Sequence, residues 1–344
     1  TCRSLIGGRN NELTVGGDLF TLPDRTEYYQ NKNGERAKMI LQVITGHQTN
    51  KALFLSDKID ILKDRLSLLL AGRYDHLSYV ESEETIPSRT DKKSYPFFTP
   101  RLALGCMITP EISVGAAYSC GTDAPSSAEL VRPDTVFLVN QAVPLFNRAL
   151  SPRRSQNFEL AFRGSLPRDG RSFLRYTGFE ATLFNCRVSD EIIPYDTIGM
   201  VCYRNAAWSN RLGFELGARL EIIRGLDLRV AYTYSHFTYL NYDAKTTGRD
   251  SLGNLVSTYR DFTGNMLPGI PGKNLFVSLS FTRSVCRHLD IYARASYQGI
   301  GGMWVNDENS DRTGSCDLLN GMIGLRLQFG KFSAMASGGV NNIL

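Results

Sequence analysis

The sequence predicts an all-β fold, an antiparallel transmembrane β-barrel, and three observations predict it. Apolar and polar residues alternate with a period of two in many separate segments. Several of these segments are long enough for a tilted membrane strand, which needs about 9 to 11 residues. The links between segments are short and long in turn, as in barrels that have short periplasmic turns and long extracellular loops.

Composition limits the alternatives. The chain has 344 residues, 42% hydrophobic and 21% charged, with a formal net charge of +5 and a mean hydropathy of −0.21. These values exclude a disordered tail, and no run approaches the roughly 18 to 20 apolar residues of a membrane helix. Composition alone leaves both a membrane barrel and a soluble enzyme open. The charge forms no basic stripe, so we predict no nucleic-acid partner.

The alternating segments are the expected strands, each with one apolar and one polar side. The clearest are 101–106, 111–118, 214–221, 227–234, 275–281 and 323–329. In the first of them, Leu102 and Leu104 fall on one side and Ala103 falls on the other. The longest are 65–79, 226–241 and 289–305. Strands of a soluble β-sandwich are usually about five or six residues long, so these lengths favour the membrane barrel.

Charged residues within the strands predict which side faces the barrel interior. An arginine or lysine that faces lipid at mid-depth costs roughly 2 to 4 kcal/mol. We therefore expect the apolar sides to face lipid and the charged sides to face the lumen. The residues expected to face the lumen are Arg73, Asp75, Glu215, Arg219, Arg229 and Arg326.

The links and the aromatic residues complete the predicted barrel. Short links are expected near 62–64, 107–110, 166–170, 222–225, 284–288 and 330–331. Long ones are expected near 80–95, 121–155, 189–199, 243–272 and 306–314. About thirteen strands result. An aromatic girdle near the strand ends is predicted from Tyr79, Tyr118, Tyr234, Tyr239, Tyr297 and Trp304.

Several motifs, taken in order, resemble the barrel portion of TonB-dependent outer-membrane receptors, which import iron complexes, cobalamin and some glycans. They are GRYD at 72–75, APSSAEL at 124–130, the segment 150–159, DEI at 190–192, LPGIP at 267–271 and VNNIL at 340–344. Arg153 stands where the family pattern has an acid. The family barrel has about 22 strands. The resemblance therefore implies that 1–344 is an incomplete barrel, about 13 of 22 strands, without the plug domain, the early strands and the final strand.

The resemblance also implies a function, which is energy-dependent uptake across the outer membrane of a Gram-negative bacterium. The implied partners are a metal-chelate ligand of the ferric siderophore class, a TonB-type energy-transducing protein that acts through the missing plug, and outer-membrane lipid. The alternatives are a passive porin or another ligand-binding barrel, with haem, cobalamin or glycan receptors ranked lower. A soluble β-rich binding module is the third possibility.

The expected extracellular loops mix positive charge with aromatic rings, which suits bulky anionic ligands such as ferric siderophores. The candidate ligand-binding residues are Arg89, Tyr95, Arg132, Arg148, Tyr242, Arg249, Tyr259, Arg260 and Trp304. Ordinary loop composition is the competing interpretation for each of them. For Arg153 and Arg154 the two interpretations are a solvated loop stem and an anion-attracting rim.

The APSSAEL motif is predicted to organise its loop rather than to contact ligand. Its members are Ala124, Pro125, Ser126, Glu129 and Leu130. Pro125 can end a strand because it lacks an N–H group. Ser126 and Glu129 have the spacing of a capping box for a short helical turn.

No enzyme, cofactor or metal site is predicted. The sequence lacks G-x-S-x-G, H-E-x-x-H and P-loop motifs, and its four histidines show no metal-ligand spacing. Haem receptors of the family usually carry a histidine after the APS motif, and this interval has none, which disfavours haem. Cys186 and Cys202 lie about equally far from Pro194, so a hairpin centred there would bring the two thiols together.

Overall fold

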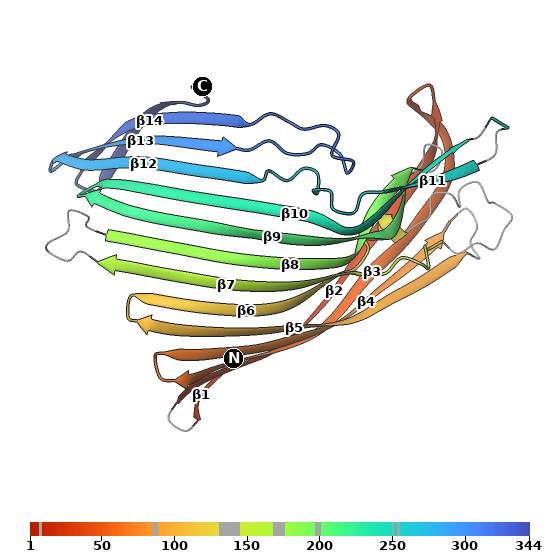
Figure 1. Ribbon diagram of the computed structural model, residues 1–344, viewed down its shortest axis with the longest axis horizontal. Helices are drawn as coiled ribbons and strands as arrows, with labels where there is room; N and C mark the ends of the chain where they lie inside the picture. Colours follow the sequence, from red (N-terminus) through yellow and green to blue (C-terminus); the bar gives the residue numbers. More distant parts are fainter. Residues whose placement is uncertain are drawn as a thin grey trace.

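The computed structural model shows a single curved β-sheet (Figure 1). It describes residues 1–6, 9–84, 89–130, 145–167, 176–196, 201–249, 251–252 and 255–344. Within these residues, fifteen strands form one sheet and one short helix follows the sixth strand. No helix in these ranges is long and apolar enough to cross a membrane.

The strands follow one another across the sheet in chain order. The first eight are β1 (Cys2–Ile6), β2 (Arg9–Lys32), β3 (Glu35–Leu62), β4 (Leu66–Glu83), β5 (Thr90–Thr109), β6 (Ile112–Asp123), β7 (Arg153–Pro167) and β8 (Tyr176–Asp196). The others are β9 (Val201–Ile223), β10 (Leu226–Arg249), β11 (Leu255–Asp261), β12 (Lys273–Cys286), β13 (Leu289–Ile300), β14 (Cys316–Phe329) and β15 (Phe332–Val340). The helix is α1 (Ser127–Leu130). Neighbouring strands pair antiparallel, and β11 branches from the long-loop end of β10.

Most of the short turns lie at one end of the sheet, and the longest connections, such as the one between β6 and β7, lie at the other (Figure 1). The antiparallel barrel wall is therefore confirmed, but the alternation of link lengths is not strict. The link expected to be short at 166–170 spans 168–175, and the link expected to be long at 189–199 spans only 197–200, because β8 extends to Asp196. At the end with the long connections, β2 and β3 are joined by a two-residue turn of Asn33 and Gly34, whose φ values are 57° and 88°. Positive φ at both central residues is the geometry of a type I′ turn, which asparagine and glycine adopt most readily.

The described part of the chain contains fifteen strands, against about thirteen expected, and β11 is a side branch of β10. The strands β2 and β3 have 24 and 28 residues, so they continue well beyond the 9 to 11 residues or so that cross a membrane. The link expected at 80–95 is shorter for the same reason, since β4 extends to Glu83 and β5 begins at Thr90. Beyond the bilayer the backbone ladder continues although the apolar alternation ends.

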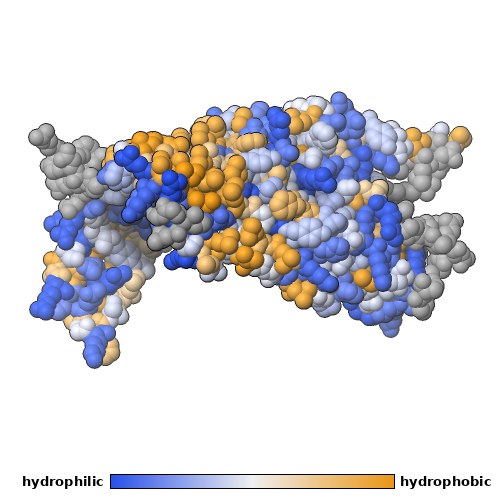
Figure 2. Space-filling view, turned by 90° about the horizontal axis from the view of Figure 1, so that it is seen from below, coloured by the Kyte–Doolittle hydropathy of each residue, from blue (hydrophilic) through white to orange (hydrophobic). Residues whose placement is uncertain are grey.

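The pairing register shows that the apolar residues of successive strands share one side of the sheet. One row of directly opposed residues consists of Leu68, Leu104, Ala116, Leu160, Leu183, Phe214 and Tyr234. Large members such as Leu160 and Leu183 are 51% and 52% exposed. Hydrophobic side chains gather mainly toward the short-turn end in Figure 2, and hydrophilic ones toward the long-loop end. We call the side of the sheet that carries this apolar row the outer side, and the opposite side the inner side.

One acid breaks the pattern on the outer side. Asp57 lies opposite Leu13 and Leu70, both of which are apolar. Asn11 Nδ2 donates a hydrogen bond to Asp57 Oδ1 at 2.7 Å. The amide satisfies part of the hydrogen-bonding demand of a carboxylate that lies among apolar neighbours.

Two sequence expectations are wrong in detail. Among the aromatic residues expected in a girdle, Tyr79 and Tyr239 are buried on the inner side, where they pack against folded loops. The hypothesis that Cys186 meets Cys202 also fails, because Cys186 lies opposite Arg211. Cys202 lies opposite Tyr195, because the β8–β9 hairpin turns beyond residue 196 rather than at Pro194.

Candidate binding surface on the inner side

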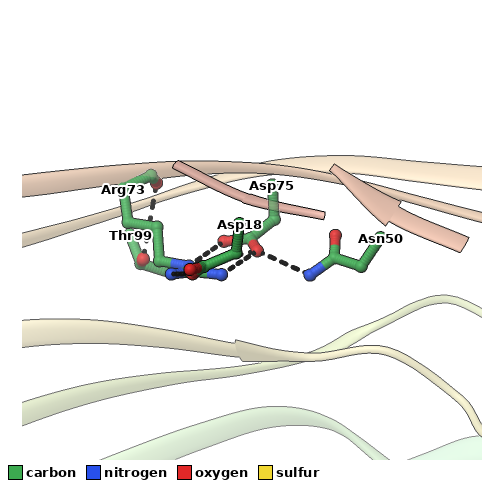
Figure 3. Close-up of polar contacts among 5 residues, drawn as sticks. All are labelled: Asp18, Asn50, Arg73, Asp75 and Thr99. Atoms are coloured by element: carbon green, nitrogen blue, oxygen red, sulfur yellow. Dashed lines mark hydrogen bonds and ion pairs between the residues drawn. The ribbon is translucent and has the colours of Figure 1, made fainter. Parts of the chain in front are cut away.

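The inner side carries a charge cluster on β2, β3 and β4, and Figure 3 shows its side chains pointing to the same side of the sheet. Arg73 Nη1 lies 2.6 Å from Asp18 Oδ2, and Arg73 Nε lies 2.9 Å from Asp75 Oδ2. Asn50 Nδ2 donates to Asp75 Oδ1 at 2.9 Å. Asp75 is only 4% exposed. Its charge is tolerated because a guanidinium and an amide both face it.

The other residues expected to face the lumen also lie on this side. Arg219 and Arg229 oppose each other on β9 and β10, and Glu215 lies opposite Thr233 in the same pair of strands. Arg219 Nη2 is 3.1 Å from Asp227 Oδ1. Arg326 of β14 lies opposite Asp290 of β13. The inner wall is therefore polar, and several of its charges are paired within the wall.

The segment after β6 folds back onto the inner side. Ser126 N donates to Glu129 Oε2 at 2.7 Å and Glu129 N donates to Ser126 Oγ at 3.3 Å, which is the reciprocal bonding of a capping box. The helix ends on the buried Leu130, which packs in one cluster with Tyr79. Tyr79 also donates its hydroxyl proton to the carbonyl of Pro125.

The continuation of this loop at 145–150 is held by β5. Lys93 Nζ donates to the carbonyl oxygens of Asn147, Arg148 and Leu150 at 3.1, 3.0 and 2.8 Å. Burial lowers the pKa of Lys93, with the neighbouring Arg148 acting in the same direction. Tyr95 OH donates to the same Leu150 carbonyl at 2.8 Å. The loop is thus fastened to the wall by charge-assisted bonds.

A second loop is fastened farther along the sheet through Asp307. Tyr239 OH donates to its Oδ1 at 2.8 Å, and Tyr242 OH donates to its Oδ2 at 3.1 Å. Burial raises the pKa of both phenols, and the carboxylate adds to the shift. Asn265 Nδ2 donates to the Asp307 carbonyl at 2.8 Å. This packing connects the segment that follows β11 with the link after β13.

The structure separates the candidate ligand-binding residues into buried and exposed groups. Tyr95 and Tyr242 are 7% and 3% exposed and engaged in the packing above. Arg89 is also largely buried and pairs with Glu83 at 3.1 Å. These three side chains support the loops rather than an open surface.

The exposed candidates gather at the long-loop end. Arg148 remains 58% exposed although it pairs with Asp91. Tyr259 of β11 is 61% exposed, and Arg260 pairs with Glu308 while remaining 61% exposed. Trp304 stacks under Arg312, with 5.5 Å from the guanidinium carbon to the ring centroid. Arg132 and the side chain of Arg249 lie outside the described residues.

Sequence reasoning missed two cations at this end. The guanidinium carbon of Arg204 lies 5.9 Å from the Tyr259 ring centroid, and Lys245 Nζ lies 5.1 Å from that of Tyr195. Each pair joins residues of different strands, so sequence spacing carried no signal for it. Among the described residues, no group of three or more His, Cys, Asp or Glu side chains is placed to hold a metal ion.

Comparison with known proteins gives a family and a fold. A family model described as TonB dependent receptor-like, beta-barrel matches residues 3–343. No curated protein matches the sequence. The structure resembles the ferric citrate transporter FecA in its unliganded form, with a TM-score of 0.70 and 15% identity. It also resembles the siderophore receptor PiuA from Acinetobacter baumannii, with a TM-score of 0.68 and 17% identity.

A third similar structure is the pyoverdine outer membrane receptor FpvA from Pseudomonas aeruginosa PAO1 bound to pyoverdine, with a TM-score of 0.62 and 19% identity. The matches cover 99% of this chain and 48%, 50% and 47% of FecA, PiuA and FpvA. The chain therefore spans about half the length of these structures. At such identities the likeness shows the fold alone.

Proposed function

The chain belongs to the TonB-dependent receptor-like β-barrel family, and from this membership we propose that it forms part of a receptor for energy-dependent uptake of a scarce metal complex. Receptor barrels of this family are Gram-negative outer-membrane proteins, so the chain lies in that membrane. The observation that carries the proposal is the family match over 3–343. We name a ferric siderophore as the first candidate ligand.

We further propose that additional strands and a plug complete this barrel in the intact receptor. In the described sheet, β1 and β15 each pair with one neighbour. An unpaired strand edge in lipid leaves backbone N–H and C=O groups without partners, so membrane sheets close into barrels. A TonB-type protein of the inner membrane would then supply energy through the plug.

The proposed ligand surface is the exposed end that carries Arg148, Arg204, Tyr259 and Arg260. Guanidinium groups and an aromatic face can bind a bulky anion without any protein atom contacting its metal. Arg204 already lies near the Tyr259 ring, so a cation and an aromatic face are presented together. A passive porin would need neither this surface nor an energy source, and it remains the alternative function.

Uptake of radiolabelled iron by cells tests the proposal. We expect the full-length receptor to support uptake of at least one ferric siderophore, and depletion of the TonB-type protein should abolish that uptake. Uptake that continues without the energy source would establish the porin alternative. Haem and cobalamin in parallel assays would identify a different ligand class.

The ligand surface has its own test. Tyr259→Ala and Arg260→Ala should each raise the half-saturation concentration for the transported chelate about ten-fold, corresponding to roughly 1.4 kcal/mol of binding free energy. Arg224→Ala is the matched control, because Arg224 is exposed in the turn at the opposite end of the sheet. Equal effects of the Arg260 and Arg224 substitutions would contradict the assignment of the surface.

A further inference from the structure

Two neighbouring arginines project from the outer side of the sheet. Arg154 of β7 lies opposite Ser189 of β8, and Arg187 of β8 lies opposite Gln156 of β7. The two are therefore diagonal neighbours on adjacent strands, with Cα atoms about 7 to 8 Å apart. Arg154 lies four residues from Phe158 of β7, and Arg187 lies four residues from Leu183 of β8. Because side chains alternate along a strand, each arginine is on the same side of the sheet as that apolar residue.

These two cations differ from those of the inner side. Arg153, the sequence neighbour of Arg154, faces inward and pairs with Asp123. Arg211 of β9 pairs with Glu191 at 3.2 Å. Arg154 and Arg187 are exposed, and among the described residues neither has a carboxylate within ion-pair distance. Their outer-side neighbours across the strands are Thr122, Gln156, Ser189 and Asn210, which carry no charge.

Their depth corresponds to the outer boundary of the bilayer. Arg154 lies about 13 residues from the end of β7 at Pro167, and Arg187 lies about 11 residues from the start of β8 at Tyr176. A membrane strand takes about 9 to 11 residues. Below them on the same strands, Phe158 and Leu183 are 57% and 52% exposed on the outer side. The surface thus presents two guanidinium groups directly above an apolar strip.

We propose that Arg154 and Arg187 bind the phosphate headgroup of a phosphorylated lipid of the outer leaflet, with its acyl chains lying on Phe158 and Leu183. A guanidinium group binds phosphate through paired N–H donors. A charged headgroup joined to acyl chains matches the order of the surface, cationic above and apolar below. The site faces away from the lumen, so it is separate from the proposed uptake route.

The test measures lipid retained by the full-length receptor purified in a mild detergent, by native mass spectrometry. The probe is a bisphosphorylated lipid A, and the comparison lipid is the same molecule without its phosphates. We expect Arg154→Gln combined with Arg187→Gln to reduce retention of the phosphorylated lipid at least about ten-fold. Arg153→Gln is the matched control and should retain it as the parent does. The lipid without phosphates should bind the parent and both variants equally weakly.

Three outcomes would overturn the proposal. The first is equal retention of the two lipids by the parent protein, and the second is an equal loss in Arg153→Gln. The third is full displacement of the lipid by millimolar inorganic phosphate, which would make the site one for phosphate rather than lipid. Heat-modifiable migration in gels confirms that each variant is folded. Uptake of iron is measured in parallel, so that a failed lipid site remains distinguishable from a failed uptake function.

Discussion

Replacing Glu81 with glutamine should stabilise the protein above pH 7. Asp24, Gly46 and Glu81 form one row across β2, β3 and β4. Gly46 has no side chain, and a methyl group there would overlap the Glu81 carboxylate. Glu81 is 1% exposed, and neither of its oxygens has a hydrogen-bond donor among the described residues. The two acids therefore face each other in a buried position.

The magnitude follows from the pKa of Glu81. Burial first, and the charge of Asp24 second, raise this pKa from 4.5 to about 7. A shift of this size corresponds to roughly 3 kcal/mol, at about 1.4 kcal/mol for each pKa unit. Between pH 4.5 and 7 the folded state binds more protons than the unfolded chain, so stability falls as pH rises. The full destabilisation is present above pH 7 and absent below pH 4.5.

Glutamine keeps the shape of Glu81, stays neutral at every pH and can donate a hydrogen bond to Asp24. We therefore expect Glu81→Gln to equal the parent near pH 4 and to be more stable by roughly 2 to 3 kcal/mol at pH 8.5. Urea unfolding in detergent micelles across this range measures the difference. Glu111→Gln, at an exposed turn position, should stay within about 0.5 kcal/mol of the parent. If the stability of Glu81→Gln depended on pH as strongly as that of the parent, the reasoning would be refuted.

Two further predictions concern the sides of the sheet and the inner loop. Leu104→Arg should block membrane assembly, because an arginine that faces lipid costs roughly 2 to 4 kcal/mol. Ala103→Arg places the charge on the inner side and should still assemble. Comparable folded yields of the two variants in outer-membrane fractions would contradict the assignment of sides. Tyr79→Phe should loosen the segment 124–130 by about 1 to 2 kcal/mol, because the Pro125 carbonyl loses its donor. Limited proteolysis should then cut this segment several-fold faster, and an unchanged rate would show that apolar packing alone holds it.

The sequence by itself determined which side each membrane strand presents to lipid. A strand places successive side chains on opposite sides, and a charge at mid-depth in lipid is costly enough to constrain the choice. Leu104 and Ala103, or Leu216 and Glu215, could therefore be assigned to opposite sides from their spacing alone. The capping box of Ser126 and Glu129 was equally local, since its bonds join residues three apart.

Only the tertiary structure decided what happens beyond the bilayer. There both sides of the sheet can face water or folded loops, so alternation no longer reports burial. The strands β4 and β5 both extend into the segment 80–95, which was predicted to be a loop. Tyr95 and Tyr242 resembled ligand-binding loop residues but are buried by contacts with Leu150 and Asp307. These partners lie 55 and 65 residues away along the chain. A local sequence pattern cannot predict such contacts, because only the folding of the chain brings the two groups together.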